Sequence, residues 1–259
     1  MSDALTRRKL IRTGLVAAAG VSGLGVAAAL TSRYGLIPPN HRGIFGPSET
    51  LTYATQRVLI PRNSLAREFN RSEISKFAPV VGEPPTDETY QRLLAGGFAE
   101  WRLTVDGLVA RPCSFSLGEL KRFPSRSQIT NHVCEQGWSF IAEWIGVPVV
   151  HILDVVGALP EARYVVVIPY ENGDPPESGW ESIDMVDAWH PQTLLAYGMN
   201  GPELPIRHGA PVRLKVPRQM GYKSVKYLRR ITVTDTVKNI GKGLGGSNAE
   251  NGYSWYAGI

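Results

Sequence analysis

A cysteine in a polar, glycine-containing segment is the first candidate for chemistry in this sequence. Cys134 stands in Asn-His-Val-Cys-Glu-Gln-Gly-Trp-Ser, residues 131–139, where an alternating stretch gives way to a loop. A thiolate is a soft metal ligand and a nucleophile, although a lone cysteine is also common as a small buried hydrophobic residue. Here Glu135 and Gln136 are too polar for an apolar core site, and Gly137 permits close backbone approach. The pattern therefore favours a functional role for Cys134.

A histidine near this cysteine gives the thiol a second interpretation. His132 precedes Cys134 by two residues. Side chains two apart on a strand share one face, so a histidine could activate the thiol as a nucleophile. That arrangement would make a thiol hydrolase or a peroxidase.

A basic segment further along the chain is the second candidate site. Residues 207–217 read Arg-His-Gly-Ala-Pro-Val-Arg-Leu-Lys-Val-Pro, and residues 221–226 read Gly-Tyr-Lys-Ser-Val-Lys. Glycine turns, basic side chains and free backbone N–H groups suit an anion such as phosphate. The segment matches neither the P-loop nor the dinucleotide-binding fingerprint. From composition alone, a hairpin with a solvated basic face is the alternative.

Cysteine usage limits the redox groups that the chain could carry itself. Only Cys113 and Cys134 are present, with no CxxC, no haem-attachment CxxCH and no iron–sulfur run. Two cysteines allow a disulfide in an oxidising compartment but not a disulfide-stapled scaffold. The sequence therefore predicts no internal haem or iron–sulfur relay.

Several motifs in a fixed order resemble one enzyme family. The first is Cys134-x-x-Gly-Trp-Ser, followed by Trp144-x-Gly-Val-Pro. The later ones are Asp187-Ala-x-His-Pro-x-Thr-Leu-Leu-Ala-Tyr-x-Met-Asn-Gly, His208-Gly-Ala-Pro-Val-Arg and Gly221-Tyr-Lys-x-x-Lys. Over roughly residues 64–237 the chain resembles the molybdopterin-dependent oxidoreductases of the sulfite oxidase superfamily. It is most similar to their exported bacterial branch, which includes the catalytic subunit of periplasmic methionine sulfoxide reductase.

The resemblance implies roles for individual residues. The family's molybdenum-ligating cysteine falls on Cys134. Its pterin-phosphate pocket falls on five positions: His208, Arg213, Ser224, Val225 and Lys226. An asparagine is common where this chain has His208. The family's usual Cys-Val-Glu-Gly-Trp is Cys-Glu-Gln-Gly-Trp here, so the carboxylate of Glu135 lies one position early. The family's upstream pterin contacts have no clean match around Asn70 and are not transferred.

The resemblance also implies the fold, the cofactor and the chemistry. A molybdenum–molybdopterin group can move an oxygen atom to or from a substrate, and the protein positions and tunes that group. We therefore expect a periplasmic oxidoreductase with a sulfite oxidase-type fold that acts on a small sulfur compound or sulfoxide. Because no internal relay is predicted, we expect a separate electron-transfer protein as partner, such as a membrane cytochrome.

Short elements must position these residues. Alternating or buried apolar runs predict strands at residues 101–109, 127–132, 164–168, 181–184, 193–197, 212–216 and 227–237. Helices are predicted from Asp87 to Leu94 with Thr86 as cap, from Ser116 to Phe123, and over residues 147–156. Residues 171–180 form a Gly/Pro loop. Strands dominate and mix irregularly with short helices, which predicts an α+β fold with mixed sheets.

The first 33 residues are typical of an export signal. Arg7, Arg8, Lys9 and Arg12 precede an apolar, small-residue stretch over residues 15–30. The adjacent arginines favour the twin-arginine export machinery, which suits a protein folded around a cofactor. A general secretory signal or an uncleaved anchor is the alternative.

The basic charge of the chain belongs to this leader. The sequence has 28 Lys+Arg and 23 Asp+Glu, and residues 1–33 contain five of the basic residues and one acid, which leaves 23 against 22. No basic tract with interleaved aromatic residues appears elsewhere. The composition therefore excludes nucleic acid as a partner.

Three segments result from this pattern. Residues 1–33 are a twin-arginine signal or possible anchor, residues 34–63 a loosely structured lead-in, and residues 64–259 the oxidoreductase domain. The C-terminal tail contains Tyr253, Trp255 and Tyr256, whose rings we expect to dock on the domain. Two other functions remain open: the Cys134/His132 thiol enzyme, and a periplasmic binding domain that holds no metal.

Overall fold

The computed structural model describes residues 35–170 and 179–259. The chain divides into two compact units, one ending at Ser64 and the other beginning at Leu65. The functional division into leader, lead-in and oxidoreductase domain stays a prediction. In the described part of the chain, no helix is both long enough and apolar enough to span a bilayer.

The first unit contains more helix than expected. The 3-10 helix η1 (Pro39–Arg42) precedes a 14-residue helix, α3 (Gly46–Leu59). The expectation of a loosely structured lead-in was wrong here. Pro47 lies in the first turn of α3, where a backbone N–H would have no partner within the helix, so its missing N–H costs nothing. Glu49 lies in the first turn and Arg57 in the last, where their charges complement the partial charges of the helix ends.

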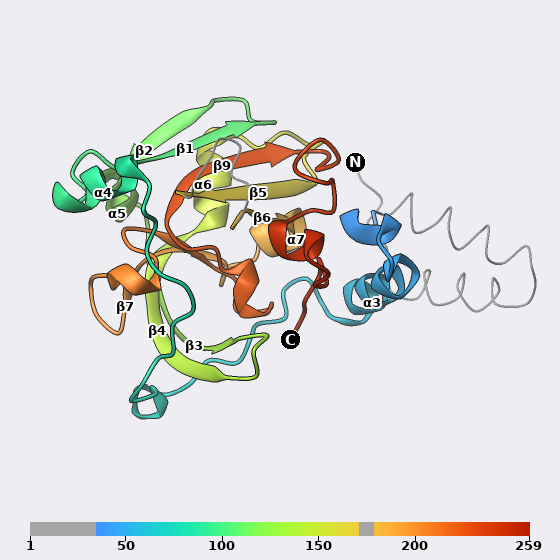
Figure 1. The fold of residues 1–259 in the computed structure, drawn as a ribbon, viewed down its shortest axis with the longest axis horizontal. Helices are drawn as coiled ribbons and strands as arrows, with labels where there is room; N and C mark the ends of the chain where they lie inside the picture. The colour runs from blue at the N-terminus through green and yellow to red at the C-terminus, as the bar shows by residue number, and fades with distance from the viewer. Residues whose placement is uncertain (1–34, 171–178) are drawn as a thin grey trace, which may run out of the picture. The chain divides into compact units, whose positions relative to one another are not determined.

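Two β-sheets form the second unit (Figure 1). The five-stranded sheet has the order β2-β1-β9-β5-β6, and the four-stranded sheet has the order β3-β4-β7-β8. β1 and β9 run parallel and the other pairs are antiparallel, so the larger sheet is mixed. The strands are β1 (Arg102–Gly107), β2 (Cys113–Ser116), β3 (Arg126–Val133), β4 (Ser139–Pro148), β5 (Tyr164–Pro169), β6 (Glu181–Asp184), β7 (Leu194–Met199), β8 (Arg213–Lys215) and β9 (Leu228–Thr234).

Short helices connect the strands of this unit. They are α4 (Glu88–Ala95), α5 (Leu117–Arg122), α6 (Val149–Val156), α7 (Met185–Ala188) and α8 (Ser247–Glu250), with the 3-10 turns η2 (Arg71–Glu73), η3 (Ile206–His208) and η4 (Gly221–Lys223). Strands therefore dominate and the helices are short. The predicted α+β fold with mixed sheets is confirmed.

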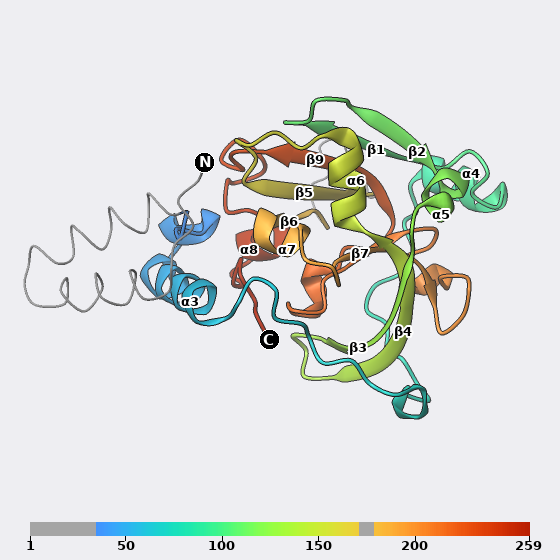
Figure 2. The same ribbon diagram turned by 180° about the vertical axis from the view of Figure 1, so that it is seen from behind.

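One hydrophobic core is shared by both sheets and by α6. β1 alternates, with Leu103 and Val105 fully buried, whereas β5 is buried on both faces over most of its length. Leu195 and Leu214 enter the same core from the four-stranded sheet. Figure 2 shows α6 in front of β5 and β1. Burial of Val212 and Leu214 in this core holds the start of β8 in place, whereas β3 is held by pairing with β4 along its length, and candidate residues lie at both places.

Several differences separate the predicted elements from the structure, and strand β2 and helix α8 were among the elements not predicted. Asp87, not Thr86, caps α4, because its carboxylate accepts a hydrogen bond from the Tyr90 backbone N–H (2.9 Å). α6 begins at Val149, since the two residues before it end β4. The ten-residue strand β4 itself was not predicted. Residues 171–178 of the predicted Gly/Pro loop lie outside the described residues.

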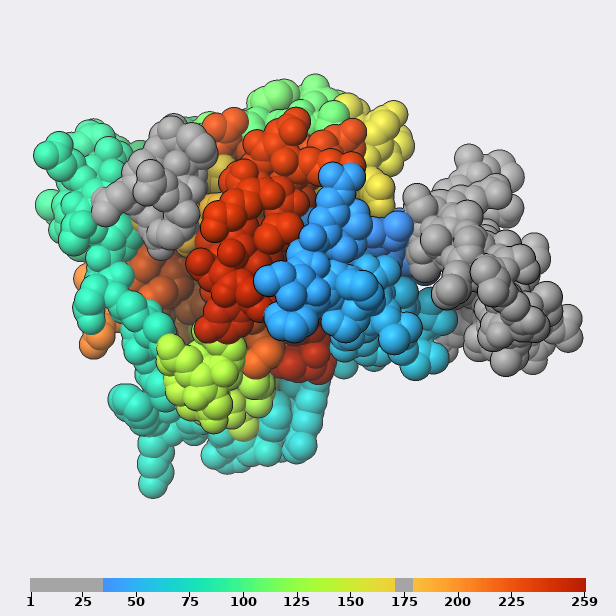
Figure 3. Space-filling model, turned by 45° about the vertical axis from the view of Figure 1, so that its right-hand side comes forward, coloured from blue at the N-terminus to red at the C-terminus, as the bar shows by residue number. Residues whose placement is uncertain are grey.

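The C-terminal tail packs on the second unit, as predicted. Trp255 and Tyr256 are buried, and Tyr253 remains 44% exposed. Trp255 Nε1 donates a hydrogen bond to Ser182 Oγ in β6 (2.8 Å). Figure 3 shows the C-terminal residues in red lying along the surface of this unit. The tail is therefore part of the folded domain.

Candidate functional site

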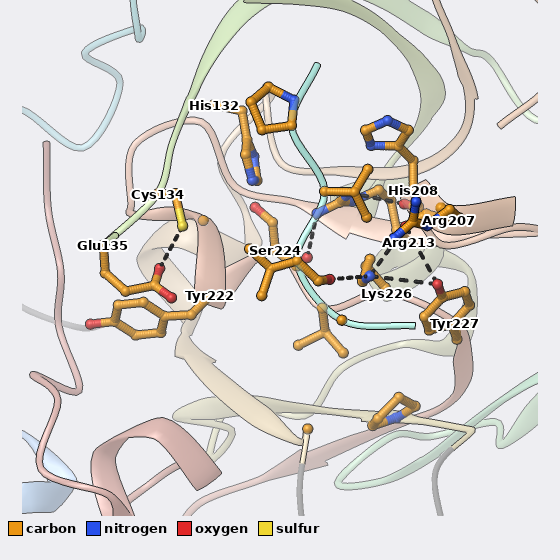
Figure 4. Close-up of a pocket in the computed structure, with 18 of the residues that line it drawn as sticks. His132, Cys134, Glu135, Arg207, His208, Arg213, Tyr222, Ser224, Lys226 and Tyr227 are labelled. Carbon is orange, nitrogen blue, oxygen red and sulfur yellow. Dashed lines mark hydrogen bonds between the residues drawn. The ribbon is translucent and has the colours of Figure 1, made fainter. Parts of the chain in front are cut away.

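A cavity of about 310 Å³ lies in the second unit. Most of its lining comes from residues 79–83, 132–140, 207–213 and 221–227. All six site residues predicted from the sequence line it: Cys134, His208, Arg213, Ser224, Val225 and Lys226. In Figure 4, Cys134 lies on one side of Ser224, and the basic side chains lie on the other. The structure therefore brings the two candidate sites of the sequence into one cavity.

Cys134 is positioned by the tight connection between β3 and β4. It directly follows β3, its backbone N–H donates to the Trp138 carbonyl (2.9 Å), and its carbonyl accepts from the Gly137 N–H (3.2 Å). Gly137 has a φ of 89°, which L side chains rarely adopt. This turn holds the thiol at the cavity wall, where it is 5% exposed.

The surroundings of Cys134 favour a metal ligand over a free nucleophile. Burial raises the pKa of the Cys134 thiol, the Gln136 backbone N–H opposes this, and the Glu135 carboxylate raises the pKa further. The thiol lies 3.4 Å from Glu135 Oε2 and donates to it. A thiolate at this position at neutral pH therefore needs a cation directly at the sulfur, which a bound metal supplies.

His132 faces a different partner from the one that a thiol enzyme requires. Its Nδ1 lies 3.4 Å from Lys215 Nζ, and in the described part of the chain no hydrogen bond joins the ring to Cys134. Burial lowers the pKa of His132 well below its usual value, with Lys215 contributing. The Cys134/His132 thiol hydrolase or peroxidase therefore lacks the nucleophile–base contact on which it depends.

Arg213 is a buried structural cation. Its Nη1 donates to the His208 carbonyl (2.9 Å), and its Nη2 donates to the Ser224 carbonyl (2.7 Å). Burial lowers the pKa of Arg213 to about 10, with Tyr227 opposing, so the side chain is charged at neutral pH. Arg213 and Lys215 are both buried, so the alternative of a hairpin with a solvated basic face is wrong. Arg213 places a fixed positive charge behind the loop that carries Ser224.

Lys226 is the more accessible, half-buried side chain of the basic wall, and the nearby Ser224 is buried. Ser224 Oγ accepts a hydrogen bond from the Val216 N–H (3.0 Å), which fixes the loop after η4. Lys226 Nζ donates to the Val81 carbonyl (2.9 Å) and to the Arg207 carbonyl (3.2 Å). Lys226 is therefore the ammonium that can reach an anion in the cavity without leaving a buried group unpaired.

His208 lies at the end of η3, beside these cations. Burial and the charges of Arg213, Lys226 and Arg207 lower its pKa to about 4. The ring is therefore neutral at pH 7 and can still donate one hydrogen bond. It meets the Phe140 ring edge-on, with the ring centres 6.0 Å apart.

This pKa predicts a dependence of stability on pH. The unfolded chain protonates His208 near pH 6.5, whereas the folded cofactor-free protein does so near its lowered value of about 4. Between these values the unfolded state binds more protons, so stability falls as the pH falls, by up to about 3 kcal/mol less the screening by solvent. Urea unfolding at pH 7 and pH 5 should show a smaller loss for His208→Asn than for the wild type. An equal loss of unfolding free energy in the two proteins would contradict the lowered pKa of His208.

Some lining residues were not found from the sequence. Trp138 and Phe140 stack with ring centres 6.1 Å apart and form an apolar wall. Asn248 reaches the cavity from the tail, and residues 79–83 close another side. Two motifs offered a signal: Trp138 belongs to Cys134-x-x-Gly-Trp-Ser, and Gly221 opens Gly-Tyr-Lys, where a Cβ would lie 2.7 Å from His132 Nε2. Phe140, Asn248 and residues 79–83 stand in no motif that marked them.

The donor set of the cavity fits a molybdopterin group. One side offers a single thiol suited to a soft metal, and the other offers Arg213, Lys226 and backbone N–H groups suited to a phosphate. The cavity volume of about 310 Å³ lies within the ~300–1,000 Å³ usual for cofactor pockets. Gly221 keeps the space beside His132 open.

Comparison with known proteins gives the same result. Residues 93–240, more than half of the chain, match the family described as oxidoreductase molybdopterin binding domain. A provisionally named protein-methionine-sulfoxide reductase subunit of Azospira oryzae is 39% identical over 203 residues, 78% of this chain and 71% of that protein. The catalytic subunit of protein-methionine-sulfoxide reductase of Ralstonia nicotianae is 34% identical over 145 residues, 52% of this chain and 44% of that protein.

Among solved structures, the crystal structure of the sulfane dehydrogenase SoxCD from Paracoccus pantotrophus aligns with a TM-score of 0.49 and 28% identity. The alignment covers 53% of this chain and 39% of that chain. The match to the family model and the identity to the first relative confirm the resemblance seen in the sequence motifs. The chain belongs to the oxidoreductase molybdopterin-binding domain family, and it is a molybdenum-dependent oxidoreductase of the sulfite oxidase superfamily.

Proposed function

We propose that this molybdopterin-dependent oxidoreductase reduces a sulfoxide group to a sulfide. The supporting observation is the single cavity that joins a buried thiol to a basic wall, in a chain whose relatives are named as protein-methionine-sulfoxide reductase subunits. Sulfoxide reduction consumes two electrons and two protons and releases water. We therefore place this reaction in the cavity that Cys134 lines.

The residues that line the cavity have different roles. When bound, the molybdopterin group supplies the oxygen-atom transfer chemistry. Cys134 would hold the metal, and His208, Arg213, Lys226 and the Ser224–Lys226 backbone would hold the phosphate. Trp138 and Phe140 exclude water from the thiol side with their stacked rings.

The electrons require a partner protein, which we propose to be a cytochrome-type protein at the membrane. Once Cys134 is assigned to the metal, Cys113 is the other cysteine, and the sequence has no haem or iron–sulfur motif. Both protein relatives are named as subunits, which supports function within an assembly. Transient electron-transfer contacts can be small, below ~1,200 Å².

Turnover with an artificial donor tests this function. The purified protein should reduce a small sulfoxide, such as free methionine sulfoxide, when a reduced dye supplies the electrons. It should not do so with a nicotinamide alone. A molybdenum-loaded protein that reduces no sulfoxide with the dye would overturn the substrate class. Sustained turnover with the nicotinamide alone would overturn the need for a partner.

We further propose that the protein is exported folded to the periplasm. The motive is the Arg7–Arg8 pair before an apolar stretch, which lies outside the described residues. Changing both arginines to lysine keeps the charge but removes the twin-arginine signal, so the protein should remain in the cytoplasm. Fractionation of cells measures this, and normal periplasmic accumulation of the double variant would contradict the proposal.

A further inference from the structure

Lys215 is a buried lysine beside the cavity whose direct contacts are with neutral groups, although the charged Arg213 lies nearby over the same Trp144 ring. It is 1% exposed, and in the described part of the chain no carboxylate forms an ion pair with it. Its Nζ donates to the Asn131 carbonyl (3.0 Å), lies 3.4 Å from His132 Nδ1, and lies 5.2 Å from the centre of the Trp144 ring. A carbonyl, a ring nitrogen and an aromatic face are all acceptors. Three acceptors therefore surround the three N–H donors of one ammonium.

This contact determines which ring nitrogen of His132 carries the proton. Burial, and then the charge of Arg213, lower the pKa of Lys215, while the Asn131 carbonyl and the Trp144 ring face both favour its protonated form. In that form Lys215 has donors and no acceptor, so His132 Nδ1 accepts from it. A neutral imidazole that accepts at Nδ1 carries its proton on Nε2. The protonated form of Lys215 therefore selects the His132 tautomer with Nε2–H.

The Nε2–H group points toward the space beside Gly221. A Cβ on Gly221 would lie 2.7 Å from His132 Nε2, and both residues line the cavity. Over the described residues, no protein group accepts a hydrogen bond from Nε2, although the side chain is only 7% exposed. Among the described residues, Nε2 is not one of the fully buried atoms that lack a partner, so it is reached from the cavity, where an acceptor can bind it. The occupant of the cavity is the acceptor available to it.

The ring cannot turn away from this direction. His132 packs against Phe140, with ring centres 5.1 Å apart, and against Trp144 at 6.0 Å and Trp138 at 6.3 Å. Its other nitrogen is held by Lys215. A donor that is fixed on all sides is preorganised, so binding an acceptor costs little conformational entropy.

We propose that His132 binds the molybdopterin group through its Nε2–H, and that Lys215 is the positioning residue that fixes this tautomer. The bound group presents a hydrogen-bond acceptor to His132, on the same side of the cavity as Cys134. This inference rests on the cofactor site of the proposed function and not on its substrate.

Nuclear magnetic resonance of the histidine ring nitrogens tests the tautomer directly. The full-length, cofactor-loaded protein would be labelled with ¹⁵N-histidine, and His132→Gln identifies the signal, because the chain has 5 histidines. We expect the proton on Nε2 in the wild type and a shift of population toward Nδ1–H in Lys215→Met. A wild-type ring protonated on Nδ1 would overturn the proposal. An unchanged ring in Lys215→Met would overturn the role of Lys215.

Cofactor retention tests the hydrogen bond itself. His132→Phe keeps an aromatic ring without a donor, whereas His132→Gln keeps an N–H donor. We expect the cofactor to leave the phenylalanine variant about five- to tenfold faster than the glutamine variant, as the loss of one hydrogen bond predicts. Equal release from the two variants would overturn the inference.

The molybdenum content of the wild type separates this inference from the proposed function. A wild-type protein without molybdenum contradicts the cofactor site, whereas a loaded wild type with equal release from both variants contradicts only the role of His132. If His132→Phe does not fold, the tautomer measured by nuclear magnetic resonance in the wild type and in Lys215→Met tests the proposal in its place.

Discussion

Replacing Cys134 with serine is expected to abolish turnover while the fold is retained. A serine hydroxyl is a hard and poorly ionised group, so it cannot replace a soft thiolate at molybdenum. We expect turnover to fall by roughly a hundredfold or more, since changes that only indirectly disturb metal ligands already cost 10–100-fold. The hydrogen bond from the Cys134 backbone N–H to the Trp138 carbonyl (2.9 Å) does not involve the side chain. The free energy of unfolding measured in urea should therefore change little.

Cys113 provides the matched control for this variant. It lies in β2, is only partly buried and packs at the edge of the hydrophobic core. Cys113→Ser should therefore keep nearly wild-type turnover. Both cysteines are free in the structure, so a comparable loss of activity in the two variants would contradict the separate role of Cys134.

Replacing Glu181 with alanine is expected to destabilise the protein by about 3–5 kcal/mol. Glu181 Oε2 lies 2.6 Å from Lys223 Nζ, and both side chains are fully buried. Burial lowers the pKa of Lys223, and the Glu181 carboxylate opposes this effect. Without the Glu181 carboxylate the buried ammonium loses its direct partner and keeps the weaker attraction of Asp187 and Asp184, and this loss is the source of the cost.

The same change should weaken cofactor binding. Glu181 Oε1 accepts hydrogen bonds from the Asn248 backbone N–H (3.0 Å) and side-chain amide (2.8 Å), so it ties the tail to β6. Lys223 ends η4, directly before Ser224 in the cavity wall. Loss of the ion pair therefore weakens both the attachment of the tail and the position of Ser224. We expect the molybdenum content of the purified protein to fall together with its free energy of unfolding.

The double variant Glu181→Leu, Lys223→Met is the control. It removes both charges and leaves neither buried alone, so it should recover most of the stability lost by the single variant. Urea unfolding of the three proteins measures this. A single-variant loss below about 1 kcal/mol, the value typical of a surface pair, would contradict the account. So would a double variant no more stable than the single one.

Local sequence patterns predicted most of the fold because strand burial follows neighbouring residues. β3 alternates between buried and more exposed positions, as its sequence predicts. Strand β4 was missed because Glu143 interrupts its apolar pattern. That carboxylate accepts from Arg71 Nη2 (2.8 Å), a residue 72 positions earlier, and no local pattern predicts such a contact. α3 was missed because Pro47 was interpreted as a breaker, whereas it starts the helix.

The candidate site was also predicted only in part from the sequence. The family resemblance implied that Cys134 and the basic segment from His208 to Lys226 belong to one site, and one cavity contains both. The alternating basic residues were ambiguous, because Lys215 is buried through contacts with the Asn131 carbonyl and the Trp144 ring, both far away in the sequence. The contact between Lys215 and His132 joins residues 83 positions apart. Only the three-dimensional arrangement reveals it.

The central claim is that Cys134 holds molybdenum in this cavity. The most direct test is metal analysis of the purified wild type and Cys134→Ser, combined with X-ray absorption at the molybdenum edge. We predict about one molybdenum per wild-type chain, as a tightly bound single cofactor requires, and one sulfur ligand fewer in any metal that the serine variant retains. A folded wild-type protein without molybdenum, from cells that make the cofactor, would contradict the claim. Unchanged sulfur ligation in the serine variant would contradict it equally.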